Sequence, residues 1–256
     1  MRGRGKKERP LEELVLTAQP EAGRVPLVCL PGTYCSPDIF ERAGQKAFAH
    51  LQTLPVSWML SPGPWDIPTL GLRVAALIRA LDLGPALLVG HSTGGAIVLA
   101  AAASAPDVVR GMLLVNTGAH MKGHGDVSPI LDLIETQSHE AVLDVLLRRS
   151  FYYQPDPDVL ERLRSYPGVL NREAALQALR SQAALDLTER LVTITAPVVV
   201  LHGWHDQARP EHFARELVEW LPHAELHLAD AGHTPMLEAP HAYEQALRRL
   251  CALTGL

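Results

Sequence analysis

The pentapeptide Gly90-His91-Ser92-Thr93-Gly94 holds the side chain whose setting most favours chemistry, the hydroxyl of Ser92. The apolar run 86–89 precedes it and the alanine-rich segment 95–105 follows, which predicts a buried strand, a sharp turn and a buried helix. A hydroxyl on such a turn is exposed to substrate. The helix that begins there directs backbone N–H groups at negative charge near the serine oxygen. This setting predicts that Ser92 is a nucleophile.

An acid and a histidine follow the serine in the chain, each after a segment with a strand pattern. Asp206 comes after the apolar run 196–201, and His233 comes after the run 224–228. A serine hydroxyl is a poor nucleophile at neutral pH and needs a base within hydrogen-bond reach. We expect His233 to take the serine proton and later return it to the leaving group, while Asp206 holds the other ring nitrogen. Asp230 is a nearby rival acid, and His202 and His205 are expected to be structural or to line a pocket.

In this order of serine, acid and histidine, each just beyond a strand, the chain resembles the α/β-hydrolase family from about residue 24 to residue 253. The segment that begins Gly232-His233-Thr234-Pro235 is similar to the histidine loop of that family. In some relatives the acid follows the strand after the serine helix. Here that place holds Asn116, which cannot ionise, so the resemblance also favours Asp206.

An oxyanion formed at the substrate carbonyl needs two backbone donors. The N–H of Thr93, the residue after the nucleophile, is expected to be one of them. The other is expected from the loop Leu30–Tyr34, where Pro31 replaces a histidine frequent in relatives. By position Thr33 is the better donor of this loop and Tyr34 the second choice.

The pattern of elements predicts an α/β fold, a mostly parallel central sheet with helices on both faces. Val25–Leu30 has the pattern of a buried strand. Ser36-Pro37 is expected to open a helix that runs to about Thr53, followed by a strand over Val56–Leu60. The apolar spacing in 74–81 predicts another helix, 109–115 another strand, and two helices are expected around 213–221 and 243–250.

Between Thr117 and Leu191 the alternation lapses into helical patterns, at 130–135, 140–149, 158–165 and 172–185. This segment is similar to the helical cap of the family, inserted after the sixth strand. The expected domains are a basic disordered tail at 1–10, a hydrolase core at 11–117 and 191–256, and a cap at 118–190. At the amino end only 11–17 can supply a strand before Val25, whereas relatives commonly have two or more there.

Composition narrows the class of protein. A length of 256 residues fits one domain of the larger α/β kind, and a net charge of −5 argues against nucleic acid as a partner. No apolar run reaches membrane-spanning length. Cys29, Cys35 and Cys251 have no metal-binding spacing, and their sparse, odd number suits a reducing cytoplasm. We expect no metal and no cofactor, and the oligomeric state stays open.

The substrate is expected to be a small molecule with an apolar acyl or aryl group, because aromatic and aliphatic side chains accompany the predicted site. The candidate pocket residues are Tyr34, His91, Phe151, Tyr152, Tyr153, Trp204 and Met236. The predicted function is hydrolysis of a carboxylic ester, lactone or thioester through an acyl-serine intermediate. Two alternatives are open: a C–C bond hydrolase of β-diketone-type substrates or an acyltransferase with the same triad, and a ligand-binding receptor without turnover.

Overall fold

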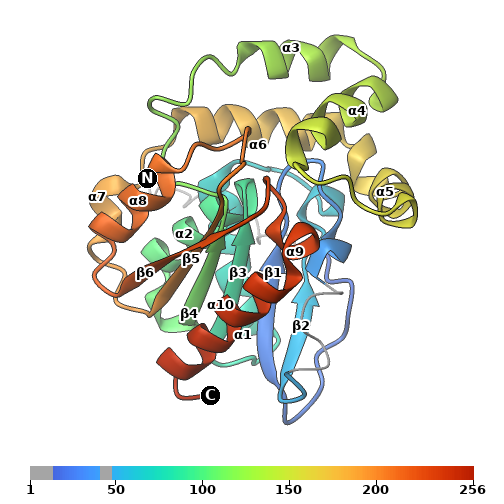
Figure 1. Ribbon diagram of the computed structural model, residues 1–256. Coiled ribbons are helices and arrows are strands. Elements are labelled where there is room, and N and C mark those ends of the chain that lie inside the picture. The colour runs from blue at the N-terminus through green and yellow to red at the C-terminus, as the bar shows by residue number, and fades with distance from the viewer. Residues whose placement is uncertain (1–13, 41–47) are drawn as a thin grey trace, which may run out of the picture.

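The computed structural model describes residues 14–40 and 48–256, and its centre is a sheet of six parallel strands (Figure 1). The strand order is β2-β1-β3-β4-β5-β6. The strands are β1 (Val25–Leu30), β2 (Leu51–Pro55), β3 (Ala86–His91), β4 (Val109–Val115), β5 (Val198–Gly203) and β6 (Ala224–Ala229). The predicted tail at 1–10 lies outside the described residues.

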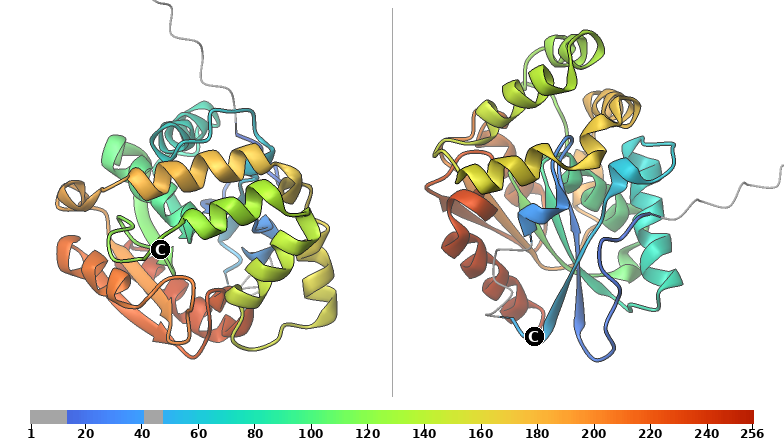
Figure 2. Two further views of the ribbon diagram at one scale, coloured as in Figure 1. Left: turned by 90° about the horizontal axis from the view of Figure 1, so that it is seen from above. Right: turned by 90° about the vertical axis from the view of Figure 1, so that its right-hand side faces the viewer.

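Helices cover both faces of the sheet, as the alternating pattern predicted (Figures 1 and 2). One face packs against α1 (Ile67–Ala80), α2 (Thr93–Ser104) and α8 (His212–Trp220). The other packs against α9 (Pro235–Glu238) and α10 (Pro240–Leu253). Successive strand residues serve opposite faces: Val28 belongs to the first core and Cys29 to the second. Both faces are buried, so the central strands are apolar along their whole length.

The strand order places a topological switch at β1 and β3. These two strands are neighbours, but the chain leaves β1 toward β2 on one side and leaves β3 toward β4 on the other. The loops that follow them therefore diverge at the carboxyl edge of the sheet. A crevice at such a divergence is the usual ligand site of an open α/β sheet.

Two predicted elements between Ser36 and Leu60 are wrong. The helix expected to run to Thr53 is a short 3-10 helix, η1 (Pro37–Phe40), in the described residues, and Leu51–Pro55 is strand β2. The strand expected at Val56–Leu60 is instead an isolated antiparallel bridge from Val56 to Leu16, followed by the 3-10 helix η2 (Trp58–Leu60). Apolar residues occur in both halves of 51–60, and pairing with β1 selects the first half as the strand.

A helical insertion separates β4 from β5 and lies over the carboxyl edge of the sheet (Figure 2). Its helices are α3 (Ser128–Thr136), α4 (His139–Ser150), α5 (Pro157–Arg164), α6 (Arg172–Ala184) and α7 (Thr188–Leu191), with the 3-10 helix η4 (Pro167–Leu170) before α6. The four helical segments expected here are confirmed as α3 to α6. The boundaries of a separate cap at 118–190 stay a prediction.

The place of this insertion in the strand order differs from the expectation. It follows the fourth strand of the described chain, not a sixth. The strand expected at 11–17 lies partly outside the described residues, and between residues 14 and 24 the chain forms only the Leu16–Val56 bridge. None of the described helices combines the length and the apolar character needed to cross a bilayer.

Candidate active site

Ser92 occupies a strained turn between β3 and α2. Its φ of 53° lies in the left-handed region, which costs energy for a residue with a Cβ. The surrounding chain holds this conformation: the Ser92 N–H donates to the Val115 carbonyl at 3.0 Å, and the Thr117 hydroxyl donates to the Ser92 carbonyl at 2.7 Å. The turn carries the serine side chain into a cavity at the carboxyl edge of the sheet.

Two glycines let the loop after β1 approach this turn closely. A Cβ on Gly94 would lie 2.0 Å from the Leu30 carbonyl oxygen, and a Cβ on Gly32 would lie 2.9 Å from the Ser92 Cβ. Any side chain at either position would push the two segments apart. The glycines therefore keep the loop after β1 next to the serine, where an oxyanion would form.

Asp206 and His233 are hydrogen-bonded to each other, as the sequence order led us to expect. His233 Nδ1 lies 2.7 Å from Asp206 Oδ2, and both side chains are buried. Burial alone would raise the pKa of Asp206. The charge of His233 and the hydrogen bonds that the carboxylate accepts outweigh burial and hold this pKa well below its usual range. An ionised Asp206 can only accept, so Nδ1 of His233 carries the hydrogen and Nε2 is free to act as a base.

The Asp206 carboxylate accepts further hydrogen bonds that fix its orientation. Its Oδ1 accepts the N–H groups of Ala208 and Arg209 at 2.7 and 2.9 Å, and its Oδ2 accepts from the side-chain amide of Asn116. Asn116 also accepts the Gly203 N–H at 3.2 Å. The sequence identified Asn116 only as a residue that could not be the acid. Asn116 directly follows β4, the neighbour of β5, and Asp206 follows β5. This position in the sequence could have indicated that Asn116 contacts the acid.

His91, the neighbour of the serine, supports the histidine loop. Its Nε2 lies 2.8 Å from the carbonyl oxygen of His233, and the two rings are 4.8 Å apart. Burial, with the nearby charge of His233, lowers the pKa of His91 to about 3. The ring is therefore neutral near pH 7, and its Nε2–H donates to the His233 carbonyl.

The residues whose backbone N–H groups are the expected oxyanion donors lie at the cavity. Thr33 and Thr93 both line the cavity, and their side chains are joined, with Thr33 Oγ1 donating to Thr93 Oγ1 at 2.9 Å. Neither backbone N–H has an acceptor among the described residues. The N–H of Tyr34 is already used, since it lies 3.2 Å from the sulfur of Met59. Thr33 is therefore the better placed of the two candidates in this loop.

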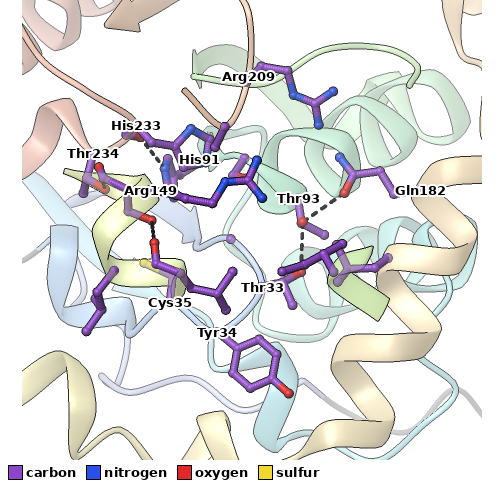
Figure 3. A pocket seen from close by; sticks show the side chains of 18 of the residues that line it. Thr33, Tyr34, Cys35, His91, Thr93, Arg149, Gln182, Arg209, His233 and Thr234 are labelled. Atoms are coloured by element: carbon purple, nitrogen blue, oxygen red, sulfur yellow. Dashed lines mark hydrogen bonds between the residues drawn. The ribbon is translucent and has the colours of Figure 1, made fainter. Parts of the chain in front are cut away.

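The insertion contacts the serine turn and the histidine loop, and Figure 3 shows the bond between Thr93 and Gln182. Thr93 Oγ1 donates to the side-chain oxygen of Gln182 on α6 at 3.0 Å. The N–H of His233 donates to the carbonyl of Ser150, the last residue of α4, at 3.1 Å. Contacts to both the serine turn and the histidine loop thus come from α4 and α6.

A cavity of about 150 Å³ contains Ser92 and His233 together with the oxyanion candidates. The serine hydroxyl makes no hydrogen bond to any described residue. Apolar side chains from the insertion form much of the wall, among them Ile134, Leu143, Leu146 and Leu179. Of the predicted pocket residues, Tyr34, His91 and Phe151 line this cavity.

The structure places the other four predicted pocket residues outside the cavity. Met236 is fully buried in the core beneath α10, because it lies on the inner side of α9. Tyr152, Tyr153 and Trp204 are exposed at the surface. These three aromatic side chains were expected in the pocket because of their residue type, but they point to the surface of the protein.

The rival acid Asp230 belongs to this surface group. Its carboxylate accepts the Tyr153 hydroxyl at 3.0 Å and lies 3.0 Å from Nε2 of His205. The His205 ring in turn stacks on the Tyr152 ring, with 3.8 Å between the ring centres. Asp230 is thereby engaged away from His233, whose Nδ1 pairs with Asp206.

Comparisons with known proteins show the family and the fold of the chain. The sequence profile of the alpha/beta hydrolase family matches residues 27–246. A 3-oxoadipate enol-lactonase from Acinetobacter baylyi is 24% identical over 188 residues, 72% of this chain and 70% of its own. An AB hydrolase superfamily protein of Bacillus subtilis, YisY, is 30% identical over 197 residues, 70% of this chain and 72% of its own. The crystal structure of the enol-lactonase from Burkholderia xenovorans superposes with a TM-score of 0.82 at 21% identity, covering 94% of this chain and 96% of its own.

Proposed function

The chain belongs to the α/β-hydrolase family of enzymes, and we propose that it is a serine hydrolase that cleaves small carboxylic esters, lactones or thioesters through an acyl-serine intermediate. One observation carries the proposal: His233, which is paired with the buried Asp206, lines the same cavity as Ser92, and Ser92 lies on a strained turn. A buried carboxylate–imidazole pair beside an exposed serine is the arrangement that activates a hydroxyl for attack on a carbonyl.

In the first half of the reaction, Ser92 Oγ attacks the carbonyl carbon while His233 Nε2 takes its proton. The carbonyl oxygen becomes an oxyanion, for which the N–H groups of Thr33 and Thr93 are the proposed donors. The imidazolium is stabilised by the carboxylate of Asp206. The bond to the leaving group then breaks, and His233 gives its proton to the departing alcohol, thiol or ring oxygen.

In the second half, a water molecule takes the place of the leaving group. His233 Nε2 removes its proton as the oxygen attacks the acyl carbon, and the same donors hold the second oxyanion. Collapse of this intermediate returns the proton to Ser92 and releases the acid. The ester or lactone class is further supported by the relative from Acinetobacter baylyi, which is named for a lactone.

The test is turnover of matched substrates with leaving groups of different chemistry: a 4-nitrophenyl ester, a thioester and a vinylogous diketone of similar size. We expect the ester and thioester to be cleaved over many turnovers and Ser92→Ala to abolish both. Ser150→Ala is the matched control, because Ser150 lines the same cavity but its hydroxyl is bonded to the Leu146 carbonyl. Faster cleavage of the diketone would favour C–C bond hydrolysis, and release of no more than one product per chain would favour a receptor.

A further inference from the structure

In the part of the chain that the structure describes, the residues that line the cavity carry positive charge but no carboxylate. Among the described residues that line it are two arginines, Arg149 and Arg209, and no aspartate or glutamate. Neither guanidinium group forms an ion pair with a carboxylate of the described chain. The wall of the cavity is otherwise mostly apolar, and apolar side chains do not neutralise the positive charge of the two arginines.

Arg209 lines the cavity but is itself buried, with only 4% of its surface exposed. Its guanidinium lies 4.8 Å from the Phe213 ring centre, and Nη1 contacts the Met121 sulfur at 2.9 Å and the His120 carbonyl at 3.4 Å. Its Nε is buried without any acceptor. Burial lowers the pKa of Arg209 to about 10, so the group stays charged at neutral pH.

Arg149 approaches from the insertion, on the last turn of α4. Figure 3 shows both guanidinium groups directed into the cavity, although they come from different elements. Both also lie close enough to His124 to act on its pKa: burial lowers this pKa, and the charges of Arg209 and Arg149 lower it further. His124 therefore adds no third charge at neutral pH.

A buried cation with weak acceptors costs free energy that an anionic ligand would offset. The charge of Asp206 acts on Arg209, but the oxygens of Asp206 are occupied by His233, Asn116 and backbone N–H groups. Apart from Nη1, which contacts His120 and Met121, the guanidinium donors of Arg209 have no acceptor in the described chain and are left for a group that comes with the substrate. Arginine matches the planar oxygens of a carboxylate.

We infer that Arg149 and Arg209 form a carboxylate subsite and that the substrate is an ester or lactone that bears a free carboxylate. This inference rests on the proposed hydrolase function. The scissile carbonyl would sit at Ser92, a short apolar segment would lie along the side chains of Leu146 and Leu179, and the carboxylate would reach the two arginines. The expected substrate is therefore amphipathic, which adds a charged group to the apolar acyl or aryl group that the sequence suggested.

The first experiment compares the 4-nitrophenyl monoester of glutaric acid with its neutral monoamide analogue, which has the same size. We expect kcat/KM of the wild type to favour the charged ester by at least about tenfold. Arg149→Gln and Arg209→Gln should each remove most of that preference, and Arg149→Lys should retain part of it. The matched control is Arg148→Gln, because Arg148 is an exposed neighbour in α4 that does not line the cavity. A butyryl ester of 4-hydroxybenzoate places the carboxylate on the leaving group and reports which side of the substrate it occupies.

Equal kcat/KM for the charged and neutral esters in the wild type would overturn the subsite, while leaving the hydrolase proposal intact. If no ester is cleaved at all, the subsite remains testable by calorimetry on Ser92→Ala. Methyl hydrogen glutarate should then bind at least about tenfold more tightly than its neutral amide, with an affinity that falls as salt rises. Equal binding of the two compounds in that variant would likewise overturn it.

Discussion

The Asp206 carboxylate illustrates how a single residue becomes fit for its proposed role. Buried carboxylates tend to become neutral, but this one accepts hydrogen bonds from Ala208, Arg209, Asn116 and His233. These contacts favour the charged form strongly enough to overcome burial. The ion therefore persists at neutral pH, where it can fix the tautomer of His233 and stabilise the imidazolium that forms during attack.

Replacement of Asp206 by Asn should lower kcat by about 10⁴, because an amide cannot stabilise the imidazolium and favours the wrong tautomer of His233. Steady-state kinetics on a 4-nitrophenyl ester measures this loss. Asp230→Asn is the control, since Asp230 bonds to Tyr153 and His205 at the surface. Loss of activity in Asp230→Asn with full activity in Asp206→Asn would show that the acid is misassigned.

For single residues, the sequence predicted those that lie in local motifs and missed those whose role arises from contacts between distant parts of the chain. Ser92 and His233 lie in short motifs just beyond strands, so position in the chain was enough to nominate them. Asn116 and Arg209 have no motif of their own. Their surroundings arise only when β4, β5 and the insertion come together.

Among the elements, the insertion and α9 together hold the histidine loop. The carboxylate of Glu238, at the end of α9, accepts four backbone N–H groups. These belong to Tyr152 and Tyr153 of the insertion and to Gly232 and Thr234 on either side of His233. Hydrogen bonds to a charged acceptor are stronger than those between neutral groups. Glu238 is thus a positioning residue that joins the insertion to the loop of the proposed base.

Glu238→Ala should lower the free energy of unfolding by about 1–3 kcal/mol and reduce kcat more than it changes KM, because four N–H groups lose their acceptor near His233. Urea unfolding and steady-state kinetics measure the two effects. Glu238→Gln should restore part of both, since one of its oxygens can still accept. Glu244→Ala, which removes only an exposed pair with Arg248, is the control. An unchanged kcat in a destabilised Glu238→Ala would limit this residue to a structural role.

Element predictions succeeded where periodicity was long and failed where it was short. The helices α6 and α10 carry apolar residues at helical spacing over several turns, and each was expected at nearly its observed place, while only the second half of α1 was expected. The segment from Leu51 to Leu60 mixes apolar residues with Gln52, Thr53 and Ser57, so the pattern alone could not locate the strand within it. Pairing with β1, a contact distant in sequence, determines that β2 occupies the first half.

For the whole molecule, the topology of the sheet determines where the chemistry can occur. The loops after β1 and β3 diverge at the carboxyl edge, which leaves room for Thr33, Ser92 and a substrate between them. The insertion then closes this crevice with apolar side chains and Arg149. The pocket was the least predictable part, because its composition depends on how the insertion faces the core. Tyr152 and Tyr153 turn outward for this reason, whereas Phe151 faces the cavity.

The central claim is that this fold activates one serine, Ser92, and the most direct test is intact-protein mass after exposure to a fluorophosphonate. The wild type and Ser150→Ala should each gain the mass of one adduct, and peptide mapping should place it on Ser92. Ser92→Ala should gain none. An adduct that persists in Ser92→Ala, or a folded wild type that gains none, would contradict the account.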